Sequence, residues 1–461
     1  MSLEPKPDAR PEAPLPNASI EHATEDSDVV RTETAGDADE LSAQSPEARR
    51  QVAMTWLMVA AGAVALAVFK PELAKTMVAF IVTLSVLVFV HEWGHYQFGR
   101  WGGMKINRFG IGFPPWIATK RYKGIDYSIG ALPIGGMVDI AGLGSEEEMV
   151  ATSKGEGIGA AAPRKGVPHG QKRFQDAALG WRFMTLFAGP MMNFIFALVV
   201  FALLFSLVGV PEIKSVSNVV EMVSTGTPAD KAGIESGDRI VSVDGVRTND
   251  TLKIRNLIRG GNGKPVSLSI ERKGQTIQRS LTPQVEDELQ EDGVSTKKGA
   301  IIGVMFSSIT EYHRVGLLRG ETGFRDSAVG YGLQSSYNLT SQIFGLLRRV
   351  VTLRLTADDK RQIGGPVKIA QAVGHTAKKS WQETILLAAS LSVNLGLMNL
   401  LPIPALDGGR IMFILYEAIT RRPFDQRKEG FVNAVGMAMV LTFMLFMTFR
   451  DVLPWIQKSL R

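Results

Sequence analysis

Five long runs of apolar residues occupy this chain of 461 residues and restrict the folds open to it. A helix rises about 1.5 Å per residue, so roughly 20 apolar residues cross the ~30 Å hydrocarbon core of a bilayer. The mean hydropathy is only +0.08 because polar segments separate the runs. The pattern predicts a polytopic α-helical membrane protein, with spans at Ala53–Phe69, Thr76–Val90, Phe183–Val210, Thr384–Leu406 and Phe431–Phe449.

Charge is spread unevenly along the chain. Residues 1–50 hold 12 acidic and 5 basic residues, a single isoleucine and no aromatic residue, a composition that predicts a disordered acidic tail. The rest of the chain carries a net charge of +13. Given the apolar runs, this excess favours an anionic membrane surface as partner, and we expect no nucleic acid. The chain has no cysteine, which excludes disulfides, iron–sulfur clusters and a thiol nucleophile.

The distribution of basic residues also orients the spans. Residues 100–180 hold 11 basic and 7 acidic residues, and the short segment between the last two runs is also basic. Both lie on one side under alternation, and the positive-inside rule places that side in the cytoplasm. Residues 211–383 then face the opposite side, in the periplasm.

The segment between the third and fourth runs is the clearest soluble part. Over Val219–Pro283, short stretches alternate apolar and polar residues and are separated by turn signals such as Asp244-Gly245. This predicts a small, mostly β domain of about 90 residues. The segment Tyr331–Ser380 is expected to be helical, with a break at Gly364-Gly365-Pro366.

The motif HEWGH, at 91–95, follows directly on the second apolar run. On a helix His91 and His95 project from one face, one turn apart, where two imidazoles can hold one tetrahedral zinc ion. Glu92 can reach water bound to that metal and act as a general base. Ionisable residues are costly at the end of an apolar run, so they indicate a functional site.

Two other interpretations of this motif remain open. A purely structural cluster would need polar partners for three side chains at membrane depth, which a metal supplies in one step. Haem ligation by two histidines normally draws them from different helices or turns, and it leaves Glu92 without a role.

A catalytic zinc site needs a third protein ligand and one open position. Asp407 is the expected third ligand, because it closes the fourth apolar run after two prolines, in NLLPIPALDG at 399–408. Irregular backbone at that depth is tolerated only where protein or a water-filled cavity receives it. The alternative is that Asp407 is an ordinary N-cap of a helix over Arg410–Ile419.

Taken together, HEWGH and NLLPIPALDG resemble the signature of the site-2 protease family of intramembrane zinc metalloproteases, most closely its bacterial RseP type. The resemblance covers roughly residues 76–450. Three further segments are similar to parts of that family: GALPIGG (130–136) to its membrane re-entrant β loop, AGPMMNF (188–194) to the start of its second core helix, and 224–245 to a PDZ domain.

The resemblance implies that His91, His95 and Asp407 hold Zn²⁺. Glu92 would be the general base toward the zinc-bound water and then the proton donor to the leaving amine.

Substrate contacts are implied as well. Asn394 and Asn399 look like the family's substrate-contacting asparagines, which would bond an unwound substrate backbone; interhelical hydrogen bonding is the alternative role for both. Gly135 and Gly136 belong to the loop that could add an edge strand to an extended substrate.

The implied fold is a polytopic helical membrane protein with an inserted β-rich PDZ domain. One PDZ domain is recognisable where the enterobacterial type has two, and it either binds peptide tails or screens substrates by size. The expected division is an acidic tail (1–50), an extra N-terminal transmembrane segment (51–75), the first half of the membrane core (76–210), the PDZ domain (211–310), a periplasmic helical linker (311–382) and the second half of the core (383–461).

The expected activity is regulated intramembrane proteolysis in the cell inner membrane. Substrates would be single-span membrane proteins such as anti-sigma factors or signal-peptide remnants, cut at a site toward the cytoplasmic side. The alternative is a non-catalytic membrane scaffold that uses its PDZ domain and keeps a structural metal site. Glu92 argues against the scaffold, because a structural site has no use for a base beside its ligand. A soluble-type metalloprotease on an anchor would not end a span with its motif, and a transporter would show an inverted repeat.

Overall fold

The computed structural model describes residues 64–65, 67–143, 170–224, 226–289, 296–356, 359 and 363–459. The predicted acidic tail at 1–50 and most of the first apolar run lie outside these ranges. The described residues of that run are helical, and residues up to Ala74 form a unit separate from the rest of the chain. The span predicted at 53–69 therefore stays a prediction.

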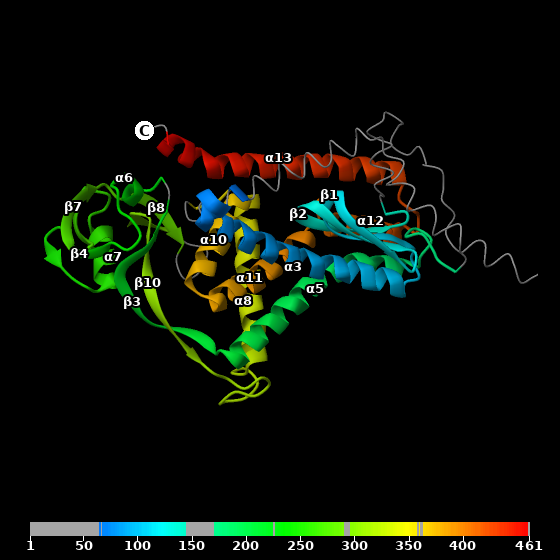
Figure 1. The fold of residues 1–461 in the computed structure, drawn as a ribbon, viewed down its shortest axis with the longest axis horizontal. Coiled ribbons are helices and arrows are strands. Elements are labelled where there is room, and N and C mark those ends of the chain that lie inside the picture. Colours follow the sequence, from blue (N-terminus) through cyan, green and yellow to red (C-terminus); the bar gives the residue numbers. More distant parts are fainter. Residues whose placement is uncertain are drawn as a thin grey trace, which may run out of the picture. The chain divides into compact units, whose positions relative to one another are not determined.

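Among the described residues, three helices are long and apolar enough to cross a membrane (Figure 1). They are α3 (Pro71–Trp101), α5 (Leu179–Leu207) and α13 (Gln426–Ser459). They contain the second, third and fifth apolar runs almost completely, although α5 ends at Leu207, before the predicted limit of Val210. Helix α3 continues past its apolar run through the HEWGH segment to Trp101. Helix α13 continues past Phe449 to Ser459.

The fourth run differs from its predicted span. Helix α11 (Trp381–Asn399) ends before the two prolines, and a turn leads into α12 (Asp407–Thr420). Pro402 and Pro404 have no N–H to donate and disfavour helix in the residue before each. Ala405 takes a left-handed backbone conformation with φ 78°. The prediction of one span over 384–406 was therefore wrong: its last seven residues form the approach to α12.

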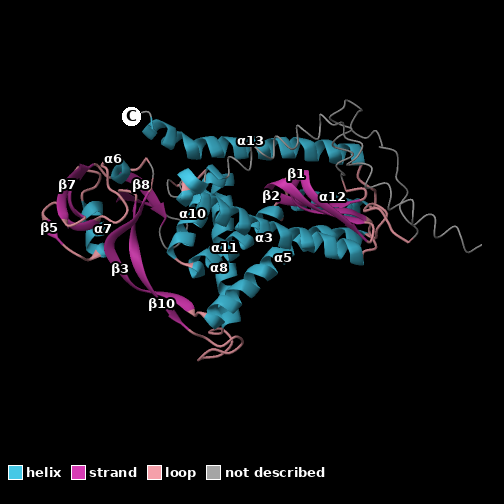
Figure 2. Cartoon of the chain, in the orientation of Figure 1, coloured by secondary structure: helices cyan, strands magenta, loops and turns pink. Residues whose placement is uncertain are grey.

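Strands β1 (Ile106–Tyr122) and β2 (Ile125–Ile140) form an antiparallel sheet (Figure 2). Both strands are folded on themselves, so residues 106–111 pair with 136–140 on one side and with 126–129 on the other. The segment 136–140 is consequently an edge: within the described ranges no strand pairs with its other side. A core that joins α3, this sheet, α5 and α12 contains Tyr96, Phe109, Ile140, Leu186 and Ile411.

The soluble segment folds as a β-rich domain, as its alternation predicts. Its six-stranded sheet has the order β10-β3-β4-β6-β7, with β5 paired to β4, and β8 and β9 form a separate pair. The strands are β3 (Val210–Val223), β4 (Arg239–Val243), β5 (Val246–Arg247), β6 (Val266–Arg272), β7 (Gln275–Leu281), β8 (Gln284–Leu289), β9 (Thr296–Ile301) and β10 (Val304–His313). The short helices are α6 (Pro228–Lys231) and α7 (Thr251–Gly260).

The expected boundary at 310/311 falls inside β10. This strand pairs with β3 as far as His313↔Val210, so the first three residues of the predicted helical linker belong to the sheet. The remainder contains α8 (Ala328–Val351) and α10 (Pro366–Lys379). Helix α10 begins at Pro366, where proline needs no intrahelical donor. Helix α8 packs with α5 and α11 around Phe201 and Val393.

A buried carboxylate links the turn before β4 to the end of β6 in the β-rich domain. Asp238, whose side chain is 1% exposed, accepts hydrogen bonds from Arg272 Nε at 2.6 Å and Nη2 at 2.8 Å. It also accepts from the backbone N–H of Glu235 at 2.8 Å. Burial alone raises the pKa of Asp238, but the Arg272 and Glu235 hydrogen bonds lower it more, so the folded-state pKa lies below the usual value.

We expect Asp238→Asn to destabilise this domain by about 3 kcal/mol, because it leaves Arg272 without its bidentate partner. Urea-dependent protease sensitivity of the full chain measures the loss. Asp244→Asn is the matched control: Asp244 sits at a left-handed turn (φ 48°) and accepts from Ser267 N, and asparagine does both, so about 0.5 kcal/mol or less should be lost.

The same carboxylate predicts an acid sensitivity. Because its folded-state pKa is below the unfolded value of about 3.9, its contribution is complete well above pH 4 and is lost as pH falls through the folded pKa. The stability gap between wild type and Asp238→Asn should narrow below about pH 4. A gap that stays constant to pH 2, or no gap at pH 7, would contradict the assignment.

Candidate metal centre

The two histidines of HEWGH lie on the same face of α3 and are both buried. Their ring centroids are 4.8 Å apart, at an interplanar angle of 82°, and their Nε2 atoms are 3.1 Å apart. The i, i+4 spacing produces this pairing directly, because residues one helical turn apart are neighbours on the surface of the helix.

Asp407 joins this pair from a segment more than 300 residues away in sequence. Its Oδ2 lies 3.1 Å from His91 Nε2 and 3.3 Å from His95 Nε2. Leu406 is the N-cap residue of α12, and Asp407 is the first residue of the helix. The alternative of an N-cap aspartate for a helix over 410–419 is therefore wrong, and the Asp407 carboxylate faces the histidines.

Two glycines allow the turn before α12 to close tightly. A Cβ on Gly408 would lie 2.2 Å from the carbonyl oxygen of Leu401, and one on Gly409 would lie 2.3 Å from that of Ile403. Any side chain at either position would push the start of α12 outward, and Asp407 with it.

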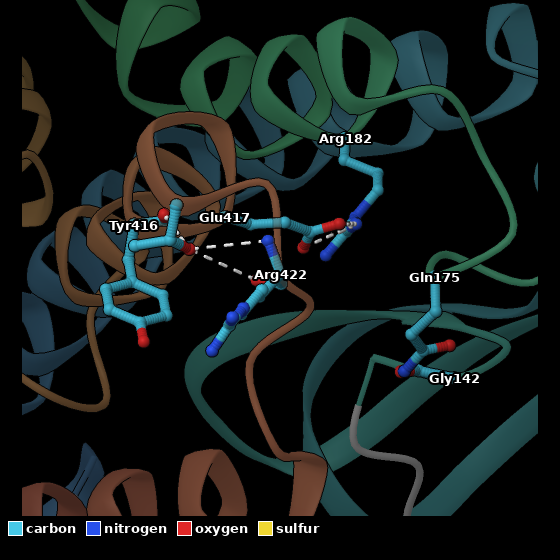
Figure 3. A network of polar contacts seen from close by, with 7 residues as sticks. Gly142, Gln175, Arg182, Tyr416, Glu417 and Arg422 are labelled. Atoms are coloured by element: carbon cyan, nitrogen blue, oxygen red, sulfur yellow. Dashed lines mark hydrogen bonds and ion pairs between the residues drawn. The ribbon is translucent and has the colours of Figure 1, made fainter.

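An ion pair fixes the other end of α12 (Figure 3). Arg182 of α5 donates from Nη1 to both carboxylate oxygens of Glu417, at 2.9 and 3.0 Å. Thr420 is the last residue of α12. Its side chain donates to the carbonyl oxygen of Tyr416 and accepts from the backbone N–H of Arg422. Arg410 donates to the carbonyl of Leu143, which ties α12 to the segment after β2.

Helix α5 forms the wall behind the histidines. A Cβ on Gly94 would lie 2.4 Å from the carbonyl oxygen of Ala188, and one on Gly189 would lie 2.3 Å from His95 Nε2. The two helices can cross this closely only because both positions are glycine. His95 Nδ1 is 2.8 Å from the carbonyl oxygen of Thr185. A carbonyl only accepts, so Nδ1 carries a proton and the neutral ring has its lone pair on Nε2.

The residues present fit a zinc ion. The three ligand atoms, two imidazole nitrogens and a carboxylate oxygen, all lie within 4.8 Å of one another. In the neutral His95 ring the Nε2 lone pair points toward a carboxylate oxygen 3.3 Å away, an arrangement that a cation between them would stabilise. Three protein ligands of this kind leave a fourth tetrahedral position for water.

Glu92 lies between this cluster and the edge segment 136–140 of β2. The backbone of Val138 lies close to its carboxylate. A Cβ on Gly136 would lie 3.0 Å from Glu92 Cγ and 2.7 Å from Val88 Cγ1, so glycine lets β2 pass over α3 at this point. Gly135 has φ 104°, a conformation that also favours glycine.

The two predicted substrate-contacting asparagines lie on α11. Asn394 is exposed, and Asn399 is the half-buried last residue of the helix, immediately before the proline turn. The exposure of Asn394 disfavours the alternative of an interhelical hydrogen bond, because such a side chain would be buried between helices.

Asn193 is a site residue that we did not predict for this role. It is fully buried on α5, and its amide Nδ2 is 3.2 Å from His91 Nδ1. A signal was present in the sequence: Asn193 is a polar residue within an apolar run, three residues after Pro190. Its partner could not be read from the sequence, because it lies 102 residues away.

Comparison with known proteins identifies the family of this chain. The model of peptidase family M50 matches residues 79–443. Proteins named as zinc metalloproteases are similar along most of their length: one from Agrobacterium fabrum is 33% identical, covering 82% of this chain and 95% of the relative, and one from Mesorhizobium japonicum is 35% identical, covering 82% and 98%. Zinc metalloprotease RasP of Geobacillus kaustophilus is 28% identical, covering 83% and 98%. The chain therefore belongs to peptidase family M50, and it is a membrane-associated zinc metalloendopeptidase of the site-2 protease type.

Proposed function

We propose that this protein cleaves the transmembrane segments of single-span membrane proteins, in regulated intramembrane proteolysis, and that anti-sigma factors or signal-peptide remnants are its substrates. The observation that carries this proposal is the position of the metal cluster: His91 and His95 are buried on a helix long and apolar enough to span a bilayer, and the half-buried Asp407 joins them from α12. A peptidase site on such a helix has ready access to substrates that are themselves in the membrane.

The proposed ligands of zinc are His91, His95 and Asp407, and the proposed general base is Glu92. Bound zinc would supply Lewis acidity and make water a stronger nucleophile near neutral pH. The Glu92 carboxylate takes a proton from the attacking water and later gives it to the nitrogen of the leaving amine.

The edge of β2 is the proposed docking strand for substrate. A transmembrane helix hides its carbonyl groups, so the cleaved segment must unwind, and its freed backbone groups then need partners in a dry environment. The segment 136–140 is unpaired on one side within the described residues and runs beside Glu92. An extended substrate paired there, over Gly135 and Gly136, would pass close to the base.

Asn394 and Asn399 are proposed to bond the same unwound backbone. An exposed amide such as that of Asn394 on a membrane-core helix would be costly against lipid. A substrate segment with unpaired carbonyl and N–H groups would satisfy it.

The β-rich domain is proposed to be a PDZ domain on the periplasmic side, with the active site toward the cytoplasmic side of the cell inner membrane. The basic segment 100–180 supports this orientation. On this proposal the domain regulates which substrates reach the site.

The test is cleavage of a single-span reporter with a short outer domain, in proteoliposomes that contain zinc. Wild type should cut the reporter within its span, and Glu92→Gln should be slower by about 10²–10⁴-fold, because it removes the base and keeps the size of the side chain. Glu212→Gln is the matched control, since that carboxylate is 70% exposed on β3, and it should cut at the wild-type rate.

Equal cleavage by wild type and Glu92→Gln would remove Glu92 from its role. A wild-type protein that holds zinc and cuts a soluble peptide but no single-span reporter would overturn the proposed substrate class. Zinc binding without cleavage of either substrate would favour a scaffold.

A further inference from the structure

The two histidines of the cluster differ in the hydrogen-bond partner of their Nδ1 atoms, the ring nitrogens that face away from Asp407. His95 Nδ1 donates to the carbonyl oxygen of Thr185, which leaves Nε2 free to bind a metal. His91 needs the same arrangement, a proton on Nδ1 and a lone pair on Nε2, if it is to be a ligand. Among the described residues, its Nδ1 meets no carbonyl or carboxylate. It meets the side-chain amide of Asn193.

The environment of that amide is closed. Asn193 is 0% exposed, and its backbone carbonyl accepts a hydrogen bond from Ser392 Oγ at 2.9 Å, which holds α5 against α11. Its Nδ2 faces His91 Nδ1 at 3.2 Å, whereas its Oδ1 is buried without a hydrogen-bond partner. A buried amide oxygen without a partner is costly.

The two ends of an amide are nearly the same size, so rotation about χ2 exchanges them without a change in packing. With Nδ2 toward His91, the amide donates, Nδ1 accepts, and the proton of the ring is on Nε2, where it points at Asp407 Oδ2 3.1 Å away. That arrangement suits a site without metal. With Oδ1 toward His91, Nδ1 donates to the amide, and the Nε2 lone pair is free.

We propose that Asn193 is the positioning residue that sets the tautomer of His91, with its amide turned so that Oδ1 accepts from Nδ1 when zinc is bound and Nδ2 donates to Nδ1 when it is not. This rests on the proposed assignment of His91, His95 and Asp407 as the zinc ligands. In the zinc-bound orientation Oδ1 gains this hydrogen bond and Nδ2 takes its former place, so the amide by itself favours neither orientation and the bound metal decides between them. An amide is suited to both states because it is both a donor and an acceptor, whereas the Thr185 carbonyl opposite His95 can only accept.

The experiment measures the zinc dissociation constant of the purified full chain by competition with a chelator, with zinc alone as the probe. Asn193→Leu keeps the approximate size and removes both hydrogen-bonding ends, and it should weaken zinc binding by about 10–100-fold. Asn193→Asp keeps an acceptor toward Nδ1, and it should bind zinc at least as tightly as wild type. Ser392→Ala is the matched control: it removes a buried hydrogen bond to the same residue without touching the amide, and it should leave zinc affinity within about threefold.

The outcomes are distinguishable. If wild type holds no zinc, the proposed ligands fail, whatever Asn193 does. If wild type holds zinc and Asn193→Leu binds it equally well, the positioning role is overturned. If Asn193→Leu and Asn193→Asp lose the same affinity, Asn193 serves packing only and the proposal is also overturned. Should Asn193→Leu not fold, the comparison of Asn193→Asp with Ser392→Ala decides: a tenfold loss in the aspartate variant alone would contradict the proposal.

Discussion

Asp407→Asn is expected to abolish both zinc retention and proteolysis. Its Oδ2 is within 3.3 Å of both histidine Nε2 atoms, and a neutral amide removes the one negative charge among the three proposed ligands. Loss of the metal removes the Lewis acid and the activated water together, so the fall should exceed the about 10²–10⁴-fold expected for Glu92→Gln and reach the background rate. Zinc per protein after dialysis and reporter cleavage are the two measurements.

Asp425→Asn provides the control for this substitution. Asp425 is an exposed carboxylate that caps the start of α13 through the N–H of Arg427 at 2.9 Å, and asparagine caps equally well. It should keep the zinc content and the rate of wild type. Stoichiometric zinc in Asp407→Asn would show that the cluster is not the metal site.

Gly189→Ala is expected to disable the site without changing any polar group. The added Cβ would lie 2.3 Å from His95 Nε2 and 2.4 Å from Cε1, far inside contact distance. The imidazole cannot move away freely, because its Nδ1 donates a hydrogen bond to the carbonyl oxygen of Thr185. The backbone of α5 is also restricted at this point, because Pro190 follows Gly189 directly. A displacement near 1 Å costs about 10²-fold in rate, and weaker zinc binding adds about 10–100-fold, which together give about 10³–10⁴-fold.

Gly180→Ala makes the same chemical change on the same helix. No described residue lies within 4 Å of a Cβ at this position, so this variant should hold zinc and cut at the wild-type rate. Zinc affinity and reporter cleavage measured for both variants separate the local collision from a general effect of alanine on α5. Wild-type zinc affinity in Gly189→Ala would mean that His95 does not bind metal in this position.

Much of the architecture follows from local rules. The apolar runs predicted α3, α5 and α13, because about 20 apolar residues form a helix of membrane length whatever packs around them. The period-2 alternation over 219–283 likewise predicted strands. The boundaries were less predictable: β10 continues to His313 because β3 is there to pair with it, and no local pattern states that partner.

For the fourth apolar run, the number of apolar residues alone predicted the wrong helix boundary. Counting apolar residues over 384–406 predicted one span, but the prolines end α11 at Asn399 and the chain turns before α12. The turn places Asp407 inward, and its backbone passes so close that only glycine fits at 408 and 409. The motif identified the residue, and the turn explains why a carboxylate at a helix start can face two histidines.

The amino-acid sequence was enough to select His91, Glu92 and His95, since the helical repeat alone places the two histidines one turn apart on one face, with Glu92 next to the first of them. It also identified Asp407 as the expected third ligand by its chemistry. Tertiary packing alone decided that Asp407 meets the histidines, that Gly189 makes room for His95, and that Asn193 faces His91. These contacts join α3, α5 and α12, and residues so far apart in sequence are brought together only by the burial of the helices against one another.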